Sequence, residues 1–137
     1  MIALAQKQGI ELFSIVYVAT PDESRRMAEA GADVIIAHVG TTIGGSIGVT
    51  GATCTLEEAA ARTQGIIDAA KSVRKDLIFL SHGGPISTPD DAAYINEHTG
   101  AMGFVGASSL ERMGVEQSLT DLTHSFKQIP CPAARNR

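Results

Sequence analysis

The chain has 137 residues, 44% of them hydrophobic and 4% aromatic, and it carries a formal net charge of −4. This acidic balance argues against nucleic-acid binding and against binding to a membrane surface, because both usually need a basic face. No apolar run approaches the roughly 20 residues that a helix needs to cross a bilayer. The chain starts without a secretory signal pattern, and Cys54 and Cys131 show no metal-binding or redox spacing, so we predict a reduced, cytoplasmic protein.

Four short apolar runs, nearly continuous and rich in β-branched or aromatic residues, are typical of parallel strands that are covered on both faces. In chain order they are Phe13–Ala19, Val34–Val39, Leu77–Ser81 and Gly103–Ala107.

Helical segments separate these strands. Thr20 and Thr55 are each followed three residues later by a glutamate, which predicts two capping boxes. Thr88, which precedes a proline, opens a third helix that ends near Gly100. A fourth helix starts around residues 114–116 and carries an apolar stripe, and the first ten residues have the pattern of the end of a preceding helix.

This alternation of strands and helices predicts an α/β fold with right-handed crossovers and a parallel sheet. Rossmann and flavodoxin-like sheets share the alternation, but the loop after the first strand lacks their glycine-rich phosphate fingerprint. Glycines follow the last three strands instead, which favours a barrel, whose sites lie at the C-terminal ends of strands. We therefore predict four strand–helix units of a TIM barrel, its strands 5–8, over residues 1–129, and a disordered tail over residues 130–137.

The loops after the last two predicted strands form a candidate anion site. Its residues are Gly83, Gly84, Gly106, Ala107, Ser108 and Ser109. Many barrels bind phosphate with the loops after strands 7 and 8, because glycine lets backbone N–H groups approach an anion and a helix N-terminus offers further donors. The alternative is that the glycines only form a tight turn and the serines only cap a helix.

Two histidines, His38 and His82, fall at the C-terminal ends of the second and third predicted strands. Each is a candidate catalytic acid or base, or a donor to phosphate. A hydrogen-bonded structural histidine is the alternative for each of them. Glu111 and Arg112 follow the serine pair and are candidates to line the mouth of the site, although an ordinary exposed helical pair explains them equally well.

The loop over residues 40–54 is long for a connection between a strand and a helix, where about 2–6 residues are usual. Gly44, Gly45 and Ser46 lie within it. We predict that this loop is a lid that closes over the substrate. A loop without a role is the alternative.

No cofactor is predicted from these residues. All four lysines fall on predicted helices, so none is placed to form a Schiff base. A Mg²⁺ site needs carboxylates, and no predicted strand ends on one. Magnesium would therefore depend on carboxylates from another half of the barrel.

The chain contains the segments AGADVIIAHVGTTIGGSIG, LSHGGPISTPDDAAYI and GFVGASSLERMGVEQSL. Together they resemble the phosphoenolpyruvate hydrolase-like TIM-barrel family, which also occurs as the C-terminal domain of plant tobamovirus-resistance-type proteins. The resemblance implies a TIM barrel and hydrolase- or lyase-type catalysis on a small phosphorylated or 2-oxo-acid compound. The matching positions are His38, Gly40, Gly44, Gly45, Ser46, His82, Gly83, Gly84, Gly106, Ser108, Ser109, Glu111 and Arg112.

A full barrel has about 250 residues, so the resemblance implies that the chain is the C-terminal half of one, with the metal-binding carboxylates in the other half. One hypothesis is an enzyme, or half of one, that binds a small anionic substrate. The other is a non-catalytic module that retains the phosphate site and binds a ligand or a protein. Four strand–helix units alone leave two sheet edges and an apolar face open, which predicts a homo-oligomer or a complementing N-terminal half.

Overall fold

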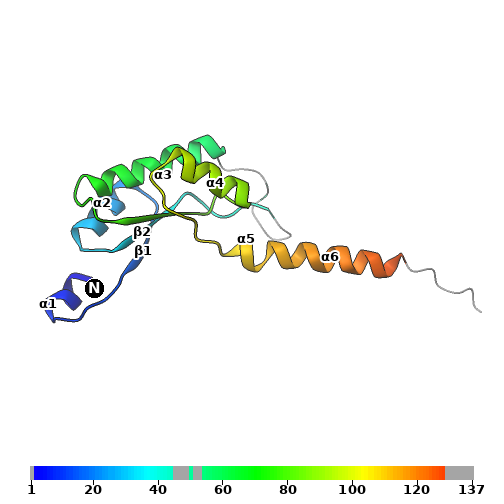
Figure 1. Cartoon of the computed structure of the whole chain (residues 1–137), viewed down its shortest axis with the longest axis horizontal. Coiled ribbons are helices and arrows are strands. Elements are labelled where there is room, and N and C mark those ends of the chain that lie inside the picture. The colour runs from blue at the N-terminus through cyan, green and yellow to red at the C-terminus, as the bar shows by residue number, and fades with distance from the viewer. Residues whose placement is uncertain (1, 45–49, 51–53, 129–137) are drawn as a thin grey trace, which may run out of the picture.

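The computed structural model describes residues 2–44, 50 and 54–128, and it has the predicted α/β architecture (Figure 1). The sheet is parallel, with the strand order β1-β2-β3, and its strands are β1 (Ile15–Val18), β2 (Val34–His38) and β3 (Ile78–His82). The helices of the described residues are α1 (Ile2–Lys7), α2 (Pro21–Glu29), α3 (Leu56–Lys71), α4 (Pro89–His98), α5 (Ser108–Glu111) and α6 (Met113–Lys127).

Capping boxes start the three helices that pack on the sheet. The side chains of Thr20, Thr55 and Thr88 each accept a hydrogen bond from the backbone N–H three residues later. The acidic side chain at that later position accepts in return from the threonine N–H. Each pair satisfies two donors that the first helical turn leaves unpaired, which fixes where the chain turns from strand to helix.

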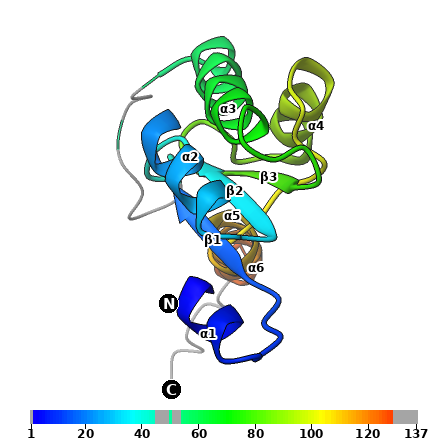
Figure 2. The same cartoon turned by 90° about the vertical axis from the view of Figure 1, so that its left-hand side faces the viewer.

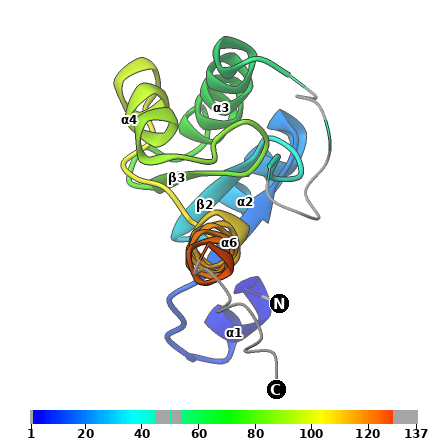
Figure 3. The same cartoon turned by 90° about the vertical axis from the view of Figure 1, so that its right-hand side faces the viewer.

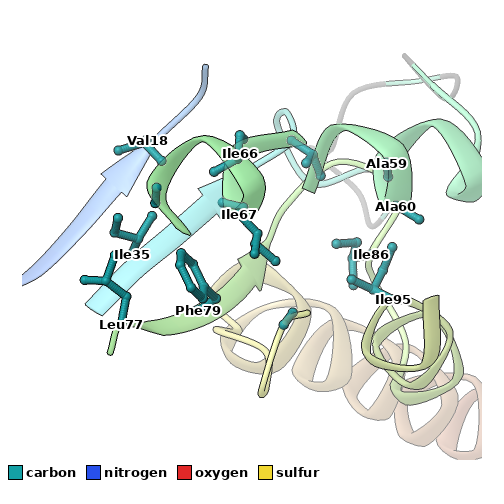
Figure 4. Close-up of a cluster of buried hydrophobic side chains, with 14 of the residues drawn as sticks. Val18, Ile35, Ala59, Ala60, Ile66, Ile67, Leu77, Phe79, Ile86 and Ile95 are labelled. Atoms are coloured by element: carbon teal, nitrogen blue, oxygen red, sulfur yellow. The ribbon is translucent and has the colours of Figure 1, made fainter. Parts of the chain in front are cut away.

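The hydrophobic core lies between the sheet and the helices α2, α3 and α4. Figure 4 shows Ile35 and Phe79 of the sheet facing Ile66 and Ile67 of α3, and all four side chains are fully buried. Burial of a side chain of this size contributes about 1.5–3 kcal/mol. This packing fixes the position of the C-terminal strand ends relative to α3, and the candidate site lies at those ends.

The fourth predicted strand, Gly103–Ala107, is not a strand of the sheet. Residues 102–105 run beside β3 and exchange three backbone hydrogen bonds with it, but the pairing amounts to a single parallel bridge between Ser81 and Phe104. The segment has no described strand on its other side, and glycines stand at 103 and 106, where they weaken a ladder. The prediction of four strands was therefore wrong by one, because a continuous apolar run does not show whether a strand has two neighbours.

The sheet face opposite to the core is exposed along the two outer strands, β1 and β3. Ile15 and Tyr17 of β1 are 57% and 53% accessible, and Ile78 of β3 is 40% accessible. Helices α1 and α6 lie on this side, and α6 extends away from the sheet (Figures 1, 2 and 3). The predicted apolar stripe of the last helix, Leu119, Leu122 and Phe126, is present, but all three side chains are exposed, as is Val115.

The predicted disordered tail, residues 130–137, lies outside the described residues. Among the residues that the structure describes, no helix is both long enough and apolar enough to cross a membrane.

Candidate functional site

Three aromatic side chains meet at the C-terminal end of the sheet. The parallel register of β2 and β3 places His38 directly opposite His82. The two imidazole rings lie 5.2 Å apart, and the ring of Tyr17 lies 6.2 Å from His38 and 5.3 Å from His82, measured between centroids. The two histidines that the sequence predicted at strand ends are therefore neighbours in one cluster.

The hydrogen bond of His82 fixes its tautomer. Its Nδ1 lies 2.6 Å from the carbonyl oxygen of Val105, in the segment that bridges to β3. A carbonyl oxygen only accepts hydrogen bonds, so Nδ1 carries the hydrogen and donates it. In the neutral ring, Nε2 is then left as an acceptor, which is the form of a general base or of a hydrogen-bond acceptor for substrate.

His38 is held in its neutral form. Burial lowers the pKa of His38 from its ordinary value of 6.5, and the neighbouring His82 lowers it further. A backbone hydrogen bond at His38 acts in the opposite direction and raises the pKa. Burial and the neighbouring ring both disfavour a positive charge on His38. His38 thus offers a ring nitrogen that accepts a proton, rather than a fixed positive charge.

The two glycines after β3 form a tight turn against the loop after β2. Gly83 and Gly84 have φ values of +80° and +58°. A Cβ on Gly83 would lie 2.2 Å from the carbonyl oxygen of Gly40, so no larger residue fits there without movement. The N–H of Gly84 donates to that same oxygen at 2.7 Å, and the N–H of Ile43 donates to the carbonyl of Gly84 at 3.1 Å. Gly83 and Gly84 thus form a tight turn, in which the amide of Gly84 is engaged within the protein.

The segment after the fourth predicted strand has free donors. Ala107 is the N-cap of α5, and neither serine caps that helix through its side chain. Within the part of the chain that the structure describes, the N–H groups of residues 106–109 and the hydroxyls of Ser108 and Ser109 donate no hydrogen bond. Because Val105 is bonded to the ring of His82, this segment directly follows the histidine pair.

Arg112 connects α6 to the loop after β2. Its guanidinium donates to the carbonyl of Gly44 at 3.3 Å and pairs with Glu116 at 3.4 Å. The predicted mouth residue Arg112 therefore contacts the start of the predicted lid. Glu111 is exposed at the end of α5. Gly45 and Ser46, the other residues predicted for the lid, lie outside the described residues.

The sequence matches a known protein family over nearly its whole length. The match, to the family described as phosphoenolpyruvate hydrolase-like, covers residues 1–129. The chain belongs to the phosphoenolpyruvate hydrolase-like family. The resemblance inferred from the three sequence segments is thereby confirmed.

Three relatives of this chain are much longer proteins. The tomato (Solanum lycopersicum) ToMV susceptible protein tm-1(GCR26) and ToMV resistance protein Tm-1(GCR237) are each 48% identical over 130 residues, which is 94% of this chain and 17% of theirs. The Sinorhizobium fredii protein y4pA is 30% identical over 129 residues, or 94% of this chain and 21% of its own. The phosphoenolpyruvate hydrolase-like chain thus spans about a fifth of the length of these relatives.

One basic residue of this phosphoenolpyruvate hydrolase-like chain was missed by sequence reasoning. Arg62 of α3 lines a cleft of about 230 Å³ together with Ala19, His38, Val39 and Gly40. Nothing in the sequence separates Arg62 from an ordinary arginine on a helix surface. Its place is set by the depth at which α3 packs on β2, which is a tertiary property.

Metal ligands do not gather in the described part of the family member. Among residues 2–44, 50 and 54–128, no group of three or more histidine, cysteine or acidic side chains is arranged to hold a metal ion. Cys54 is buried just before α3, and its thiol is free.

Proposed function

We propose that this chain is the anion-holding part of an enzyme that acts on a small phosphorylated or 2-oxo-acid compound, with hydrolase- or lyase-type chemistry. The observation that carries the proposal is the juxtaposition of the histidine pair with the donors of residues 106–109, which have no partner among the described residues. Membership of the phosphoenolpyruvate hydrolase-like family supports the same substrate class.

Each part of the site has a chemical role in this proposal. The N–H groups of residues 106–109 and the hydroxyls of Ser108 and Ser109 receive the phosphate or carboxylate, because unpaired backbone donors suit an anion. His82, whose Nδ1–H is held by Val105, presents Nε2 to accept a proton from substrate or water. His38, kept neutral, is the second proton acceptor. In this proposal Gly83 and Gly84 shape the site, and residues 106–109 supply the hydrogen-bond donors.

The architecture supports a position in a barrel. A parallel sheet with helices α2, α3 and α4 on one face and an open opposite face is what part of a (β/α)8 barrel would present. We infer that the strands of this chain are strands 5–8 of such a barrel, the fourth being completed when its outer edge is paired. Magnesium, if used, would be held by carboxylates from the other strands.

A titration followed by amide NMR tests the anion site. Inorganic phosphate and phosphoenolpyruvate are expected to shift the amide resonances of residues 106–109. The amide resonance of Gly9, which lies in an exposed turn near the start of the chain, is expected to stay unchanged. If neither compound moves residues 106–109 at millimolar concentration, the anion site is wrong.

A turnover assay tests the role of the histidines. Phosphate release from phosphoenolpyruvate is measured with Mg²⁺ in a longer family member that contains this domain. We expect substitution by glutamine at the position of His82 to lower kcat by about 10²–10⁴-fold, the usual contribution of a general acid or base. The matched control is the position of His98, whose ring stacks on Tyr94 away from the site. Ligand binding without turnover in every protein tested would support the non-catalytic module instead.

We also infer that a second copy of the chain covers the open surfaces. The outer edge of β1 is paired with no other described strand, and the apolar stripe of α6 is exposed. Sedimentation is expected to show a homodimer that Leu122→Glu dissociates, because a charge on the stripe opposes burial. Thr120→Glu, on another side of α6, is the control and leaves the dimer intact. A monodisperse monomer of the unmodified chain contradicts this inference.

A further inference from the structure

The cleft beside His38 continues into a second hollow between α3 and the start of α2. The cleft of about 230 Å³ and the neighbouring hollow of about 340 Å³ share two lining residues, Ala19 and Arg62. The neighbouring hollow is otherwise lined by small or apolar residues: Pro21, Ala61, Gly65 and Ile66. Arg62 therefore stands at the junction of a polar cleft at the strand ends and an apolar groove below it.

Arg62 differs from every other arginine that the structure describes. Arg25 and Arg26 pair with Asp22, Arg74 pairs with Asp76, and Arg112 pairs with Glu116. Arg62 makes no ion pair and no hydrogen bond with any described residue.

The acidic residue best placed to pair with Arg62 is used elsewhere. Glu58 lies four residues earlier on α3, the spacing at which helical side chains meet. Its carboxylate instead accepts the N–H of Thr55 at 2.9 Å as part of the capping box. The guanidinium thus lines the cleft without a counter-ion from the described part of the chain.

We infer that Arg62 binds a carboxylate group of the ligand in this cleft. This inference rests on the proposed function, and it adds that the substrate carries a carboxylate in addition to the group held by residues 106–109. A guanidinium presents two parallel donors that match the two oxygens of a carboxylate. Because His38 is neutral at pH 7, Arg62 supplies the positive charge of the cleft.

The order of the groups along the sheet edge defines the ligand. Arg62 lines a cleft with Ala19 and Gly40, which follow β1 and β2. The two histidines end β2 and β3, and Val105, which bonds to His82, leads directly into residues 106–109. A compound with a carboxylate at one end and a phosphate at the other places its reacting bonds beside the histidine pair. The apolar groove below Arg62 accepts a short apolar substituent next to the carboxylate. The ligand class is therefore a small compound that carries both a carboxylate and a phosphate group.

Binding to the unmodified chain and to Arg62→Gln tests this assignment, with inorganic phosphate, pyruvate and phosphoenolpyruvate as probes. Arg26→Gln is the matched control, because Arg26 is also exposed on a helix and pairs with Asp22 at 3.9 Å. We expect Arg62→Gln to weaken phosphoenolpyruvate and pyruvate by about tenfold or more, the size of a lost charge-assisted hydrogen bond, and to leave inorganic phosphate unchanged. Pyruvate is expected to shift the amides of Gly40 and Arg62.

The outcomes separate this inference from the function on which it rests. If phosphoenolpyruvate still shifts residues 106–109 and Arg62→Gln binds it as well as the unmodified chain does, the carboxylate assignment is overturned and the anion site stands. An equal loss of inorganic phosphate would mean that Arg62 holds the phosphate, which also overturns it. If pyruvate shifts Gly40 and Arg62 while no probe moves residues 106–109, the Arg62 site stands and the proposed phosphate site fails.

Discussion

The substitution Gly83→Ala measures how closely the loops after β2 and β3 are packed. Gly83 has a φ of +80°, and its added Cβ would lie 2.2 Å from the backbone oxygen of Gly40. A left-handed conformation costs a residue with a side chain about 1–2 kcal/mol. Relief of the contact requires the backbone to shift, at about 1–3 kcal/mol for overpacking. We expect Gly83→Ala to lower the free energy of unfolding by about 2–5 kcal/mol, the sum of the two effects.

Gly9 provides a matched control for the backbone conformation. Its φ is +69°, and a Cβ there meets nothing within 4 Å. Gly9→Ala therefore carries only the conformational cost of about 1–2 kcal/mol. Gly84→Ala is expected to fall between them, since its φ is +58° and its nearest contact is the Val39 oxygen at 3.1 Å.

Urea unfolding of the three variants gives the comparison. The free energies are extrapolated linearly to water, and the slope m is checked for equality so that differences in the midpoint report stability. Gly83→Ala should exceed Gly9→Ala by at least about 1 kcal/mol, the lower bound of the overpacking cost. Equal losses in the two variants would refute the close approach of Gly83 to Gly40, and with it the account of how the site is shaped.

Three further predictions concern the core, a helix and acid stability. The Thr63 hydroxyl is buried without a partner among the described residues, whereas the Ser24 hydroxyl donates to the Ile66 carbonyl at 2.8 Å. In urea unfolding Thr63→Val should therefore gain about 1 kcal/mol and Ser24→Ala should lose about 1 kcal/mol. Gly65→Ala should raise the thermal midpoint by an amount equivalent to about 1 kcal/mol, because the site is helical and a Cβ meets open space. Hydrogen bonds from the Ser14 N–H and hydroxyl lower the pKa of Asp33. The stabilising effect of this carboxylate is therefore present above the unfolded pKa of about 4 and is lost as pH falls through the folded pKa. Asp33→Asn should flatten the acid limb of a curve of stability against pH.

Local signals in the sequence were enough to predict the main elements. The capping boxes at Thr20 and Thr55 involve residues three positions apart, so the sequence contains every group that forms them. The strands were located for a similar reason, since apolar runs between such helices are buried on the helix-covered face. The extent of the pairing was not predictable, because the length of a ladder depends on a neighbour that is distant in the sequence. Residues 103–107 illustrate this, as they have one neighbouring strand and form one bridge.

The same distinction applies to the site. Parallel strands of similar length end at one edge, so the proximity of His38 and His82 followed from their positions in the predicted strands. The hydrogen bond from the Gly84 N–H to the Gly40 carbonyl could not be predicted from the sequence, because it depends on the approach of two loops that lie more than forty residues apart. Arg62 was missed for the same reason, since the packing of α3 brings it to His38.

The proposed anion segment lies at the weakest edge of the sheet, and this couples ligand binding to the order of that edge. Residues 102–105 are attached to β3 by three backbone hydrogen bonds and by the ring of His82, and residues 106–109 follow at once. A ligand that accepts from residues 106–109 binds well only while this edge is docked, so it stabilises the docked form by about 2.7 kcal/mol at one hundred times its Kd. Such linkage is reciprocal. Whatever pairs with the outer edge beyond Phe104 is therefore expected to raise the affinity for the anion, and the chain alone is expected to bind more weakly than the same domain within a longer family member.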